Sequence, residues 1–262
     1  MPQKSGRYTY QIHVTEHGKT ISEKVTFDVS DQLQHPIPFM GWLSWNAVES
    51  EVSESIVKQV ADLFTEKNLT NYGWNAVMMD DWWHAKSRAA DGKPLPDPKR
   101  FPNGLTPVSD YVHGKGMRFG IYTDAAEYTC AGAFGSFGKE QIDADAYARW
   151  KVDIVKCDYC NAPSERDTAF IRYRAMADAL EKAGYGTMLY ICEWGEREPW
   201  KWGAEAGGKM ASSSAWSSLR GSNERAIGED HIHQRANCER YSSCVMPGPL
   251  PPQSILEDLP VP

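Results

Sequence analysis

Five consecutive residues, Lys156-Cys157-Asp158-Tyr159-Cys160, combine a cation, a carboxylate and two thiols. They follow Val152-Asp153-Ile154-Val155, a β-branched and largely apolar run that is typical of a buried strand. Burying a lysine and an aspartate together at a strand end is costly unless the two groups form an ion pair or take part in chemistry. A structural ion pair that caps the strand is one interpretation, and a reactive site is the other.

Other predicted strands end in the same kinds of residue, which favours a site. Their ends read Trp42-Leu43-Ser44-Trp45, Asp80-Asp81-Trp82-Trp83, Tyr122-Thr123-Asp124 and Cys192-Glu193-Trp194. The carboxyl ends of successive parallel strands lie on one rim of a sheet, where barrel enzymes place their catalytic groups. The sequence therefore predicts a pocket lined by carboxylates, one lysine and aromatic rings.

These residue types suit sugar chemistry. Carboxylates accept hydrogen bonds from sugar hydroxyls, a lysine donates them, and aromatic faces pack against the C–H surface of the ring. Glycoside hydrolysis also needs two carboxyl groups with different roles. Lys156, two residues from Asp158 on the same strand face, would keep that carboxylate ionised and fit to act as a nucleophile.

Short apolar strands that alternate with amphipathic helices must position these residues. We predict strands at 39–43, 74–80, 117–123, 152–158 and 187–193, and helices near 51–67, 105–115, 140–150 and 165–184. Gly116 and Gly184 follow two of the helices, as C-terminal capping glycines do. Repeated strand–helix–strand units predict right-handed crossovers and a parallel sheet, in either a (β/α)8 barrel or a doubly wound sheet.

Residues 7–30 have a different pattern, because apolar and polar residues alternate on both sides of Glu16-His17-Gly18-Lys19. This pattern predicts a β-hairpin. We therefore divide the chain into a β-hairpin extension (1–35), a partial (β/α) barrel (36–208) and an irregular, disordered tail (209–262).

Composition narrows the function classes. A chain of 262 residues with 41% hydrophobic and 24% charged residues fits one large globular α/β domain. The net charge of −7 argues against nucleic acid or an anionic membrane as partner, and no apolar run approaches the roughly 20 residues of a membrane span. The first residues lack the apolar core of a signal peptide, which predicts a cytoplasmic protein or one without its export signal.

Six cysteines are too few for a disulfide scaffold at this length. A zinc site built from Cys157, Cys160, His231 and His233 is an alternative, but their spacing fits no standard zinc knuckle. We therefore expect neither a metal nor a cofactor.

Residues 38–203 resemble glycoside hydrolase family 27, the α-galactosidase and α-N-acetylgalactosaminidase family. Seven ordered motifs carry the resemblance: Met40-Gly41-Trp42-Leu43-Ser44-Trp45-Asn46, Met79-Asp80-Asp81-Trp82-Trp83, Arg100-Phe101-Pro102-Asn103-Gly104, Gly120-Ile121-Tyr122-Thr123-Asp124, Thr129-Cys130-Ala131-Gly132, Lys156-Cys157-Asp158-Tyr159-Cys160 and Ile191-Cys192-Glu193-Trp194-Gly195.

The resemblance implies a retaining glycosidase with a (β/α)8 catalytic barrel followed by a β-sandwich. By similarity, Asp158 is the nucleophile, and Asp80 and Asp81 bind the 4- and 6-hydroxyls of galactose. Lys156 would bridge neighbouring hydroxyls, and Glu193 would lie near the 2-position.

The resemblance also implies roles for two aromatic residues and two cysteines. Trp45 and Tyr122 match positions that line the pocket, with simple barrel packing as the alternative. Cys130 and Cys160 match a family disulfide between two active-site loops, which would favour a secreted or periplasmic protein.

The resemblance stops after the fifth predicted strand. The family continues with a Trp-Arg pair and then an Asp that acts as acid/base, whereas this chain reads Gly207-Gly208-Lys209-Met210-Ala211-Ser212-Ser213-Ser214 and has no carboxylate from there until Glu224. Three further β/α units need about 90 residues, and fewer remain. We therefore expect an incomplete barrel of about five β/α units, with frameshifted or otherwise aberrant sequence from about residue 209. A natural truncated relative with a linker or partner-binding tail is the alternative.

The sequence thus predicts an α-galactosidase that acts on small α-galactosides and has neither nucleic acid nor membrane as partner. Loss of the acid/base would lower the rate by about 10²–10⁴-fold, so we expect weak or no hydrolysis of aryl α-galactosides unless Glu224 or Glu229 replaces it. The alternatives are an inert fragment or sugar-binding remnant, and a specificity for α-N-acetylgalactosaminides or β-L-arabinopyranosides.

Overall fold

A computed structural model of the chain describes residues 6–29 and 40–211. The chain divides into two units, Met1–Ile37 and Pro38–Pro262. Several sequence predictions lie outside the described residues: the tail from residue 212 onward, the zinc ligands His231 and His233, and the alternative acids Glu224 and Glu229.

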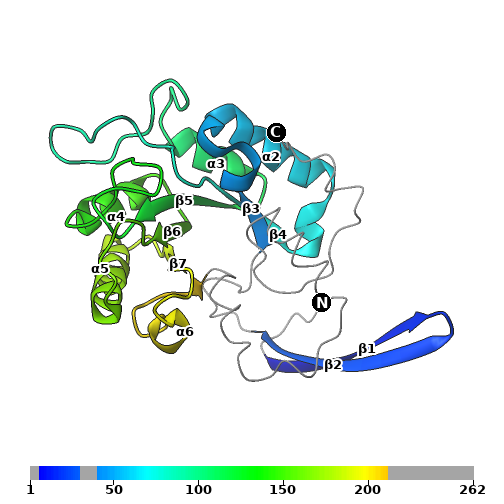
Figure 1. Cartoon of the computed structure of the whole chain (residues 1–262). Helices are drawn as coiled ribbons and strands as arrows, with labels where there is room; N and C mark the ends of the chain where they lie inside the picture. Colours follow the sequence, from blue (N-terminus) through cyan, green and yellow to red (C-terminus); the bar gives the residue numbers. More distant parts are fainter. Residues whose placement is uncertain (1–5, 30–39, 212–262) are drawn as a thin grey trace. The chain divides into compact units, whose positions relative to one another are not determined.

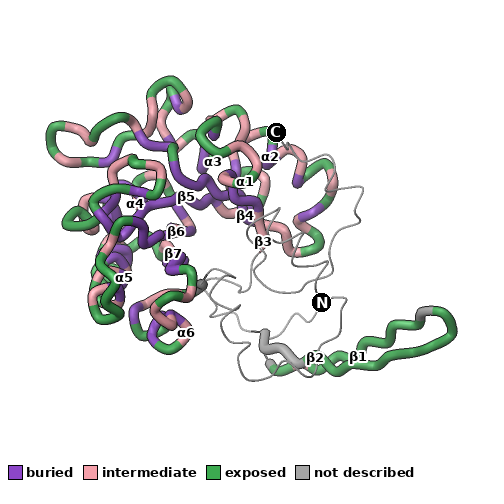
Figure 2. The backbone as a smooth tube through the Cα atoms, in the orientation of Figure 1, coloured by how far each residue is buried: buried purple, intermediate pink, exposed green. Residues whose placement is uncertain are grey.

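The first unit contains the predicted hairpin. Strands β1 (Gly6–Glu16) and β2 (Lys19–Val29) pair antiparallel along their whole length. His17 and Gly18 form the two-residue turn with φ of 47° and 76°, the left-handed pair that matches the twist of a hairpin. Tyr10 pairs with Val25 and Val14 pairs with Ile21, so these apolar residues share one face of the ribbon. All four are exposed, and Figure 2 shows most of β1 and the described part of β2 exposed.

The second unit contains a parallel sheet with the strand order β3-β4-β5-β6-β7-β8. The strands are β3 (Met40–Leu43), β4 (Trp74–Met78), β5 (Arg118–Asp124), β6 (Ile154–Asp158), β7 (Met188–Cys192) and β8 (Met210–Ala211). Because the spatial order follows the chain without reversal, every crossover moves one strand onward in the same direction. A doubly wound sheet reverses at a switch point instead. The prediction of an incomplete (β/α)8-type barrel is confirmed.

Four helices connect these strands along the outside of the curved sheet (Figure 1). They are α2 (Glu54–Glu66), α3 (Thr106–Gly114), α4 (Glu140–Arg149) and α5 (Arg166–Ala183). Local signals set their ends: the Ser53 side chain caps α2, and Gly184 ends α5 in the left-handed conformation. All four lie where the hydrophobic periodicity predicts helices.

Several short elements were not predicted. They are the helices α1 (Trp45–Val48) and α6 (Pro199–Trp202), the 3₁₀ turns η1 (Glu49–Glu51) and η2 (Leu69–Tyr72), and strand β8. Elements this short have no readable periodicity. Strand β8 exists because Met210 and Ala211 pair with β7, so regular structure extends slightly beyond the predicted boundary at residue 208.

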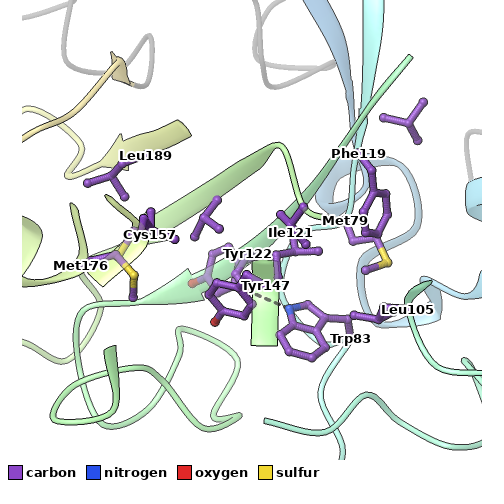
Figure 3. Packing of buried hydrophobic residues seen from close by; sticks show 14 of the residues in the cluster. Met79, Trp83, Leu105, Phe119, Ile121, Tyr122, Tyr147, Cys157, Met176 and Leu189 are labelled. Atoms are coloured by element: carbon purple, nitrogen blue, oxygen red, sulfur yellow. Dashed lines mark hydrogen bonds between the residues drawn. The ribbon is translucent and has the colours of Figure 1, made fainter. Parts of the chain in front are cut away.

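The two faces of the sheet belong to different hydrophobic clusters, because side chains alternate along a strand. The larger cluster fills the space between sheet and helices, where Figure 3 shows Phe119 and Ile121 among Trp83, Leu105 and Tyr147. The smaller cluster lies on the opposite face and consists of strand residues: Leu43, Ala76, Met78, Ile154, Met188 and Tyr190. Burial on both faces explains why the strands read as continuous apolar runs.

One glycine allows the first two strands of the sheet to pair closely. A Cβ atom at Gly41 would collide with the backbone carbonyl of Ala76. The register between β3 and β4 shifts between Met40 and Gly41. Glycine at this position therefore allows β3 to lie close to β4, which places Ser44, the residue after β3, beside the end of β4.

Within the described ranges, none of the helices is long and apolar enough to cross a lipid bilayer.

Candidate active site

Five carboxylates are buried at the carboxyl ends of strands β4 to β7. Their exposed fractions are at most 5%, and they belong to Asp80, Asp81, Asp124, Asp158 and Glu193. Burying a carboxylate is costly unless donors or cations compensate for the lost water. The partners of each carboxylate therefore indicate what it can do.

Asp158 is the last residue of β6 and accepts hydrogen bonds from a backbone N–H and a phenol, with the Cys192 side chain of β7 as a further partner. The backbone N–H of Tyr159 donates to Oδ1 at 3.0 Å, and the hydroxyl of Tyr122 donates to Oδ2 at 3.2 Å. Burial raises the pKa of Asp158 to about 6, while the charge of Lys156 opposes that shift. Asp158 is therefore ionised at neutral pH, as a nucleophile must be.

Lys156 forms an ion pair with Asp80, at 2.7 Å between Nζ and Oδ2. This corrects the structural interpretation of the sequence, which paired Lys156 with its strand neighbour Asp158. Burial alone would lower the pKa of Lys156, but Asp80 and other acidic neighbours raise it above its ordinary value. The backbone N–H of Asp80 donates to the Ser44 hydroxyl at 2.8 Å, so the end of β3 also holds this pair in place.

Asp81 is held by backbone donors from two loops. Trp82 N–H donates to Oδ1 at 2.6 Å, and Ala131 N–H donates to Oδ2 at 2.9 Å. Trp82 has a φ of 75°, which is unusual for a residue other than glycine and marks a strained turn at this strand end. Burial raises the pKa of Asp81, with the hydrogen bonds opposing it.

The disulfide between Cys130 and Cys160 is present, as the sequence resemblance implied. It joins the loop after β5 to the loop after β6. Residues in or beside these loops supply backbone donors to three of the carboxylates: Ala131 to Asp81, Tyr159 to Asp158, and Cys160 to Asp124. The covalent bridge therefore fixes the donors that compensate for carboxylate burial.

The same disulfide bears on metal binding. The side chains of Asp124, Cys130, Asp158 and Cys160 place one potential ligand atom each within 4.8 Å of one another. The two sulfur atoms are bonded to each other, so they are not available as thiolate ligands. The alternative zinc site loses Cys160 for the same reason.

Asp124 ends strand β5, and the sequence predicts no role for it. It is completely buried, with Oδ1 accepting from Ala126 N–H at 2.9 Å and Oδ2 accepting from Cys160 N–H at 3.0 Å. Burial, followed by the charge of Asp158, raises its pKa to about 8. A carboxyl group without exposed surface cannot reach a leaving group, so Asp124 is not a candidate for the acid/base.

Glu193 has an ion-pair partner of its own, Arg197. The Arg197 guanidinium forms an ion pair with Glu193 Oε1, and Arg197 N–H donates to Oε2 at 3.2 Å. Arg197 also donates to Ser164 O at 3.0 Å, which couples Glu193 to the loop after β6. Trp45 is partly buried as the first residue of α1, directly after Ser44.

Two further side chains were missed from the sequence. Arg197 lies in Gly195-Glu196-Arg197-Glu198, and its i,i+4 spacing from Glu193 was the available signal. Ser44 belongs to the motif Met40-Gly41-Trp42-Leu43-Ser44-Trp45-Asn46. Its hydrogen bond with the Asp80 backbone could not be predicted, because it depends on the close approach of β3 and β4.

Residues 37–207 match the family described as Melibiase_2: Alpha galactosidase A. Alpha-galactosidase A of Cellvibrio japonicus is 40% identical over 170 residues, which cover 65% of this chain and 41% of that protein. Alpha-galactosidase mel1 of Schizosaccharomyces pombe is 40% identical over 170 residues, which cover 63% of this chain and 39% of that protein.

Solved structures agree with these sequence matches. Alpha-galactosidase I from Mortierella vinacea superposes with a TM-score of 0.65 at 33% identity, covering 70% of this chain and 46% of that one. The MEL1 α-galactosidase of Saccharomyces cerevisiae superposes with a TM-score of 0.64 at 36% identity, covering 66% of this chain and 39% of that one. The chain spans less than half the length of each of these relatives. Because the family match covers more than half of the chain and includes all seven motifs, this protein belongs to the Melibiase_2, or alpha galactosidase A, family, the glycoside hydrolase family 27 that its motifs resemble.

Proposed function

We propose that this chain carries the galactose-recognising and nucleophile-bearing part of a retaining α-galactosidase. The observation that carries the proposal is the environment of Asp158: a buried, ionised carboxylate at a strand end, held by two donors and lying near the Lys156–Asp80 pair. The names of its relatives support this choice of sugar, and one solved structure of the Saccharomyces cerevisiae enzyme is described as containing raffinose.

In this proposal Asp158 attacks the anomeric carbon of an α-galactoside. A bond forms between a carboxylate oxygen and that carbon, the glycosidic bond breaks, and water later releases galactose from the covalent intermediate. The Tyr122 hydroxyl keeps Asp158 oriented during the attack.

The remaining polar side chains of the site recognise the sugar. Asp80 and Asp81 accept hydrogen bonds from the 4- and 6-hydroxyls, and Lys156 donates to neighbouring hydroxyls. Glu193, oriented by Arg197, lies toward the 2-position, and the rings of Trp45 and Tyr122 line the pocket.

The carboxylates of the described rim leave the acid/base role open. Asp80 is paired with Lys156, and Asp81 accepts two backbone bonds. Asp124 is fully buried, and Glu193 is paired with Arg197. The chain should therefore react best with substrates whose leaving group needs no proton. Fluoride is such a group, since it departs with the bonding electron pair when Asp158 attacks.

The test uses the full chain and an α-galactosyl fluoride whose ring carries a second fluorine, so that the glycosyl-enzyme forms and then hydrolyses slowly. We expect a mass increase of one fluorinated hexosyl group on the peptide that contains Asp158, and none in Asp158→Asn. Asp153→Asn, the same change at the other end of β6, is the matched control and should be labelled like the wild type. Labelling that persists in Asp158→Asn would exclude Asp158 as the nucleophile.

Aryl α-galactosides test the missing acid separately. Their turnover should be lower by about 10²–10⁴-fold than expected for a complete retaining site, because no positioned acid protonates the leaving group. Rapid turnover of substrates with poor leaving groups would instead show that this chain supplies an acid. Galactose that raises the melting temperature without any labelling would identify a sugar-binding remnant.

A further inference from the structure

The hydroxyl of Tyr122 lies between two carboxylates. Its oxygen is 3.2 Å from Oδ2 of Asp158 and 3.5 Å from Oδ2 of Asp124. A phenol has one hydrogen, so it can donate to only one of the two at a time. All three side chains are at most 5% exposed, and the choice is therefore made by protein groups and not by water.

The two carboxylates differ in their other partners. Asp158 lies on the same strand as the Lys156 cation, whose charge favours its ionised form. Asp124 receives backbone N–H groups from Ala126 and Cys160. The charged groups that act on Asp124 are the carboxylates of Asp158 and Asp81, and both disfavour a second negative charge.

Arg172 on α5 donates to the carbonyl of Ala125, the residue after Asp124, at 2.7 Å, but no cation is among the groups that most shift the Asp124 pKa. Cys157 on β6 and Tyr173 on α5 interact electrostatically with Asp124, and burial raises the pKa of both, so they are neutral. The sulfur atoms of Cys130 and Cys160 form the disulfide and do not titrate. Asp124 is thus the carboxyl group of this pair that retains a proton at neutral pH, which agrees with its pKa of about 8.

We propose that Asp124 is a positioning residue that acts through Tyr122. The protonated carboxyl group of Asp124 donates a hydrogen bond to the Tyr122 oxygen. The Tyr122 hydroxyl then donates its own hydrogen to Oδ2 of Asp158. The role for catalysis rests on the proposed function of Asp158 as the nucleophile. Every donor in the chain Asp124–Tyr122–Asp158 then meets an acceptor. Ionisation of Asp124 leaves two anions competing for one hydrogen, and Asp158 loses its donor for part of the time.

The first experiment observes the hydrogen-bond chain directly and needs no substrate. Tyrosine labelled with ¹³C at Cζ is incorporated into the full chain, and Tyr122 is assigned by its loss in Tyr122→Phe. We expect the Tyr122 signal to shift with a midpoint near pH 8, as Asp124 ionises. Burial raises the pKa of Tyr122 itself, so its own ionisation does not enter this window. The shift should vanish in Asp124→Asn and persist in Asp153→Asn.

A second signal separates the hydrogen bond from simple charge repulsion. The ¹³C signal of the Asp158 carboxyl should show a main step near pH 6 and a second step near pH 8 in the wild type. The second step should lose more than half its amplitude in Tyr122→Phe. A second step that stays undiminished in Tyr122→Phe would mean that Asp124 acts through space, and a missing Tyr122 response in the wild type would also overturn the proposal.

Covalent labelling of Asp158 measures the consequence for reaction. Asp124→Ala, which removes the donor, and Tyr122→Phe should each slow labelling about tenfold at pH 7, the effect expected for one hydrogen bond to a charged group. The double variant should be no slower than the slower single variant, because both changes break one chain. Additive losses would contradict the proposal. If the wild type is not labelled at all, the proposed function fails, and the two carbon signals still decide the role of Asp124.

Discussion

Strand β6 has a lysine–aspartate ion pair near each end, and both pairs have an N–O distance of 2.7 Å. Just before the strand, Lys151 pairs with Asp110, and the two side chains are 47% and 50% exposed. Within the strand, Lys156 pairs with Asp80, and their side chains are 11% and 4% exposed. An exposed pair contributes about 0–1 kcal/mol, whereas removing one partner of a buried pair costs about 3–5 kcal/mol. Burial, and not distance, therefore distinguishes the two ends.

Asp153, just before β6, and Asp158, its last residue, differ in the same way. Asp153, at the amino end, accepts from Phe119 N–H at 2.8 Å and lies 2.7 Å from Nε2 of His113, so it ties β5 and α3 to β6. Asp158, at the carboxyl end, is surrounded by other carboxylates and held mainly by a phenol and a backbone N–H. The amino end of the sheet holds elements together, while the carboxyl end gathers buried carboxylates, at the edge where α/β-barrel enzymes place their catalytic groups.

The largest expected effect comes from removing the lysine at each end. Lys156→Met should lower the free energy of unfolding by about 3–5 kcal/mol, because Asp80 is left buried without its cation. Lys151→Met should change it by less than about 1 kcal/mol. Urea denaturation of both variants measures the difference. Equal losses would show that burial does not separate the two pairs.

Loss of the disulfide between Cys130 and Cys160 should lower the free energy of unfolding almost as much. Replacing Cys130 and Cys160 together by serine should cost about 3 kcal/mol, because the bridge closes a loop with a sequence separation of 30. Amide exchange at Ala131, Tyr159 and Cys160 should accelerate, while exchange at Phe119, at the amino end, should not. Cys157→Ser is the control, since this buried cysteine is unbridged. Uniform acceleration at both ends would mean that the bridge has no local role.

The pH dependence of stability should change when the buried Asp158 is replaced. The pKa of Asp158 is raised from 3.8 to about 6, so the folded state holds this proton more tightly than the unfolded state does. The contribution of Asp158 to stability therefore falls as pH rises between about 4 and 6, by up to about 3 kcal/mol. Asp158→Asn should remove this part of the decline and leave the part due to Asp124, whose pKa is raised to about 8, so the variant should be more stable than the wild type above pH 6. Asp153→Asn should keep the decline, and urea denaturation at several pH values distinguishes the two.

The smallest effect concerns two residues with left-handed backbone. Trp82, at the carboxyl end, has a φ of 75°, and Lys151, at the amino end, has a φ of 56°. Trp82→Gly and Lys151→Gly should each change the free energy of unfolding by less than about 1 kcal/mol, because relief of strain offsets the entropy that glycine adds to the unfolded chain. Trp82→Gly alone should reduce thermal protection by galactose, since Trp82 is 36% exposed and follows Asp81 directly. Equal protection in both variants would remove Trp82 from the sugar site.

Much of the fold could be read from local patterns. The five main strands, the four long helices and the hairpin have periodicities long enough to recognise, and their capping residues mark where several of them end. The carboxylates at the strand ends followed from the same pattern. Strand β8 could not be predicted, because two residues carry no alternation and only pairing with β7 makes them a strand.

The sequence by itself determined which residue types end the strands, and hence that carboxylates, one lysine and aromatic rings gather on one rim. Only the tertiary structure decided which of these groups bind one another. Lys156 meets Asp80 across 76 residues, Ala131 N–H reaches Asp81 across 50, and Cys160 N–H reaches Asp124 across 36. A local pattern sets which way a side chain points, but the partner of a buried charge depends on strand order and on the loops that close over it. For this reason the sequence predicts that Asp124 ends a strand, but the role proposed for it depends on its contacts with Tyr122 and Asp158 in the folded protein.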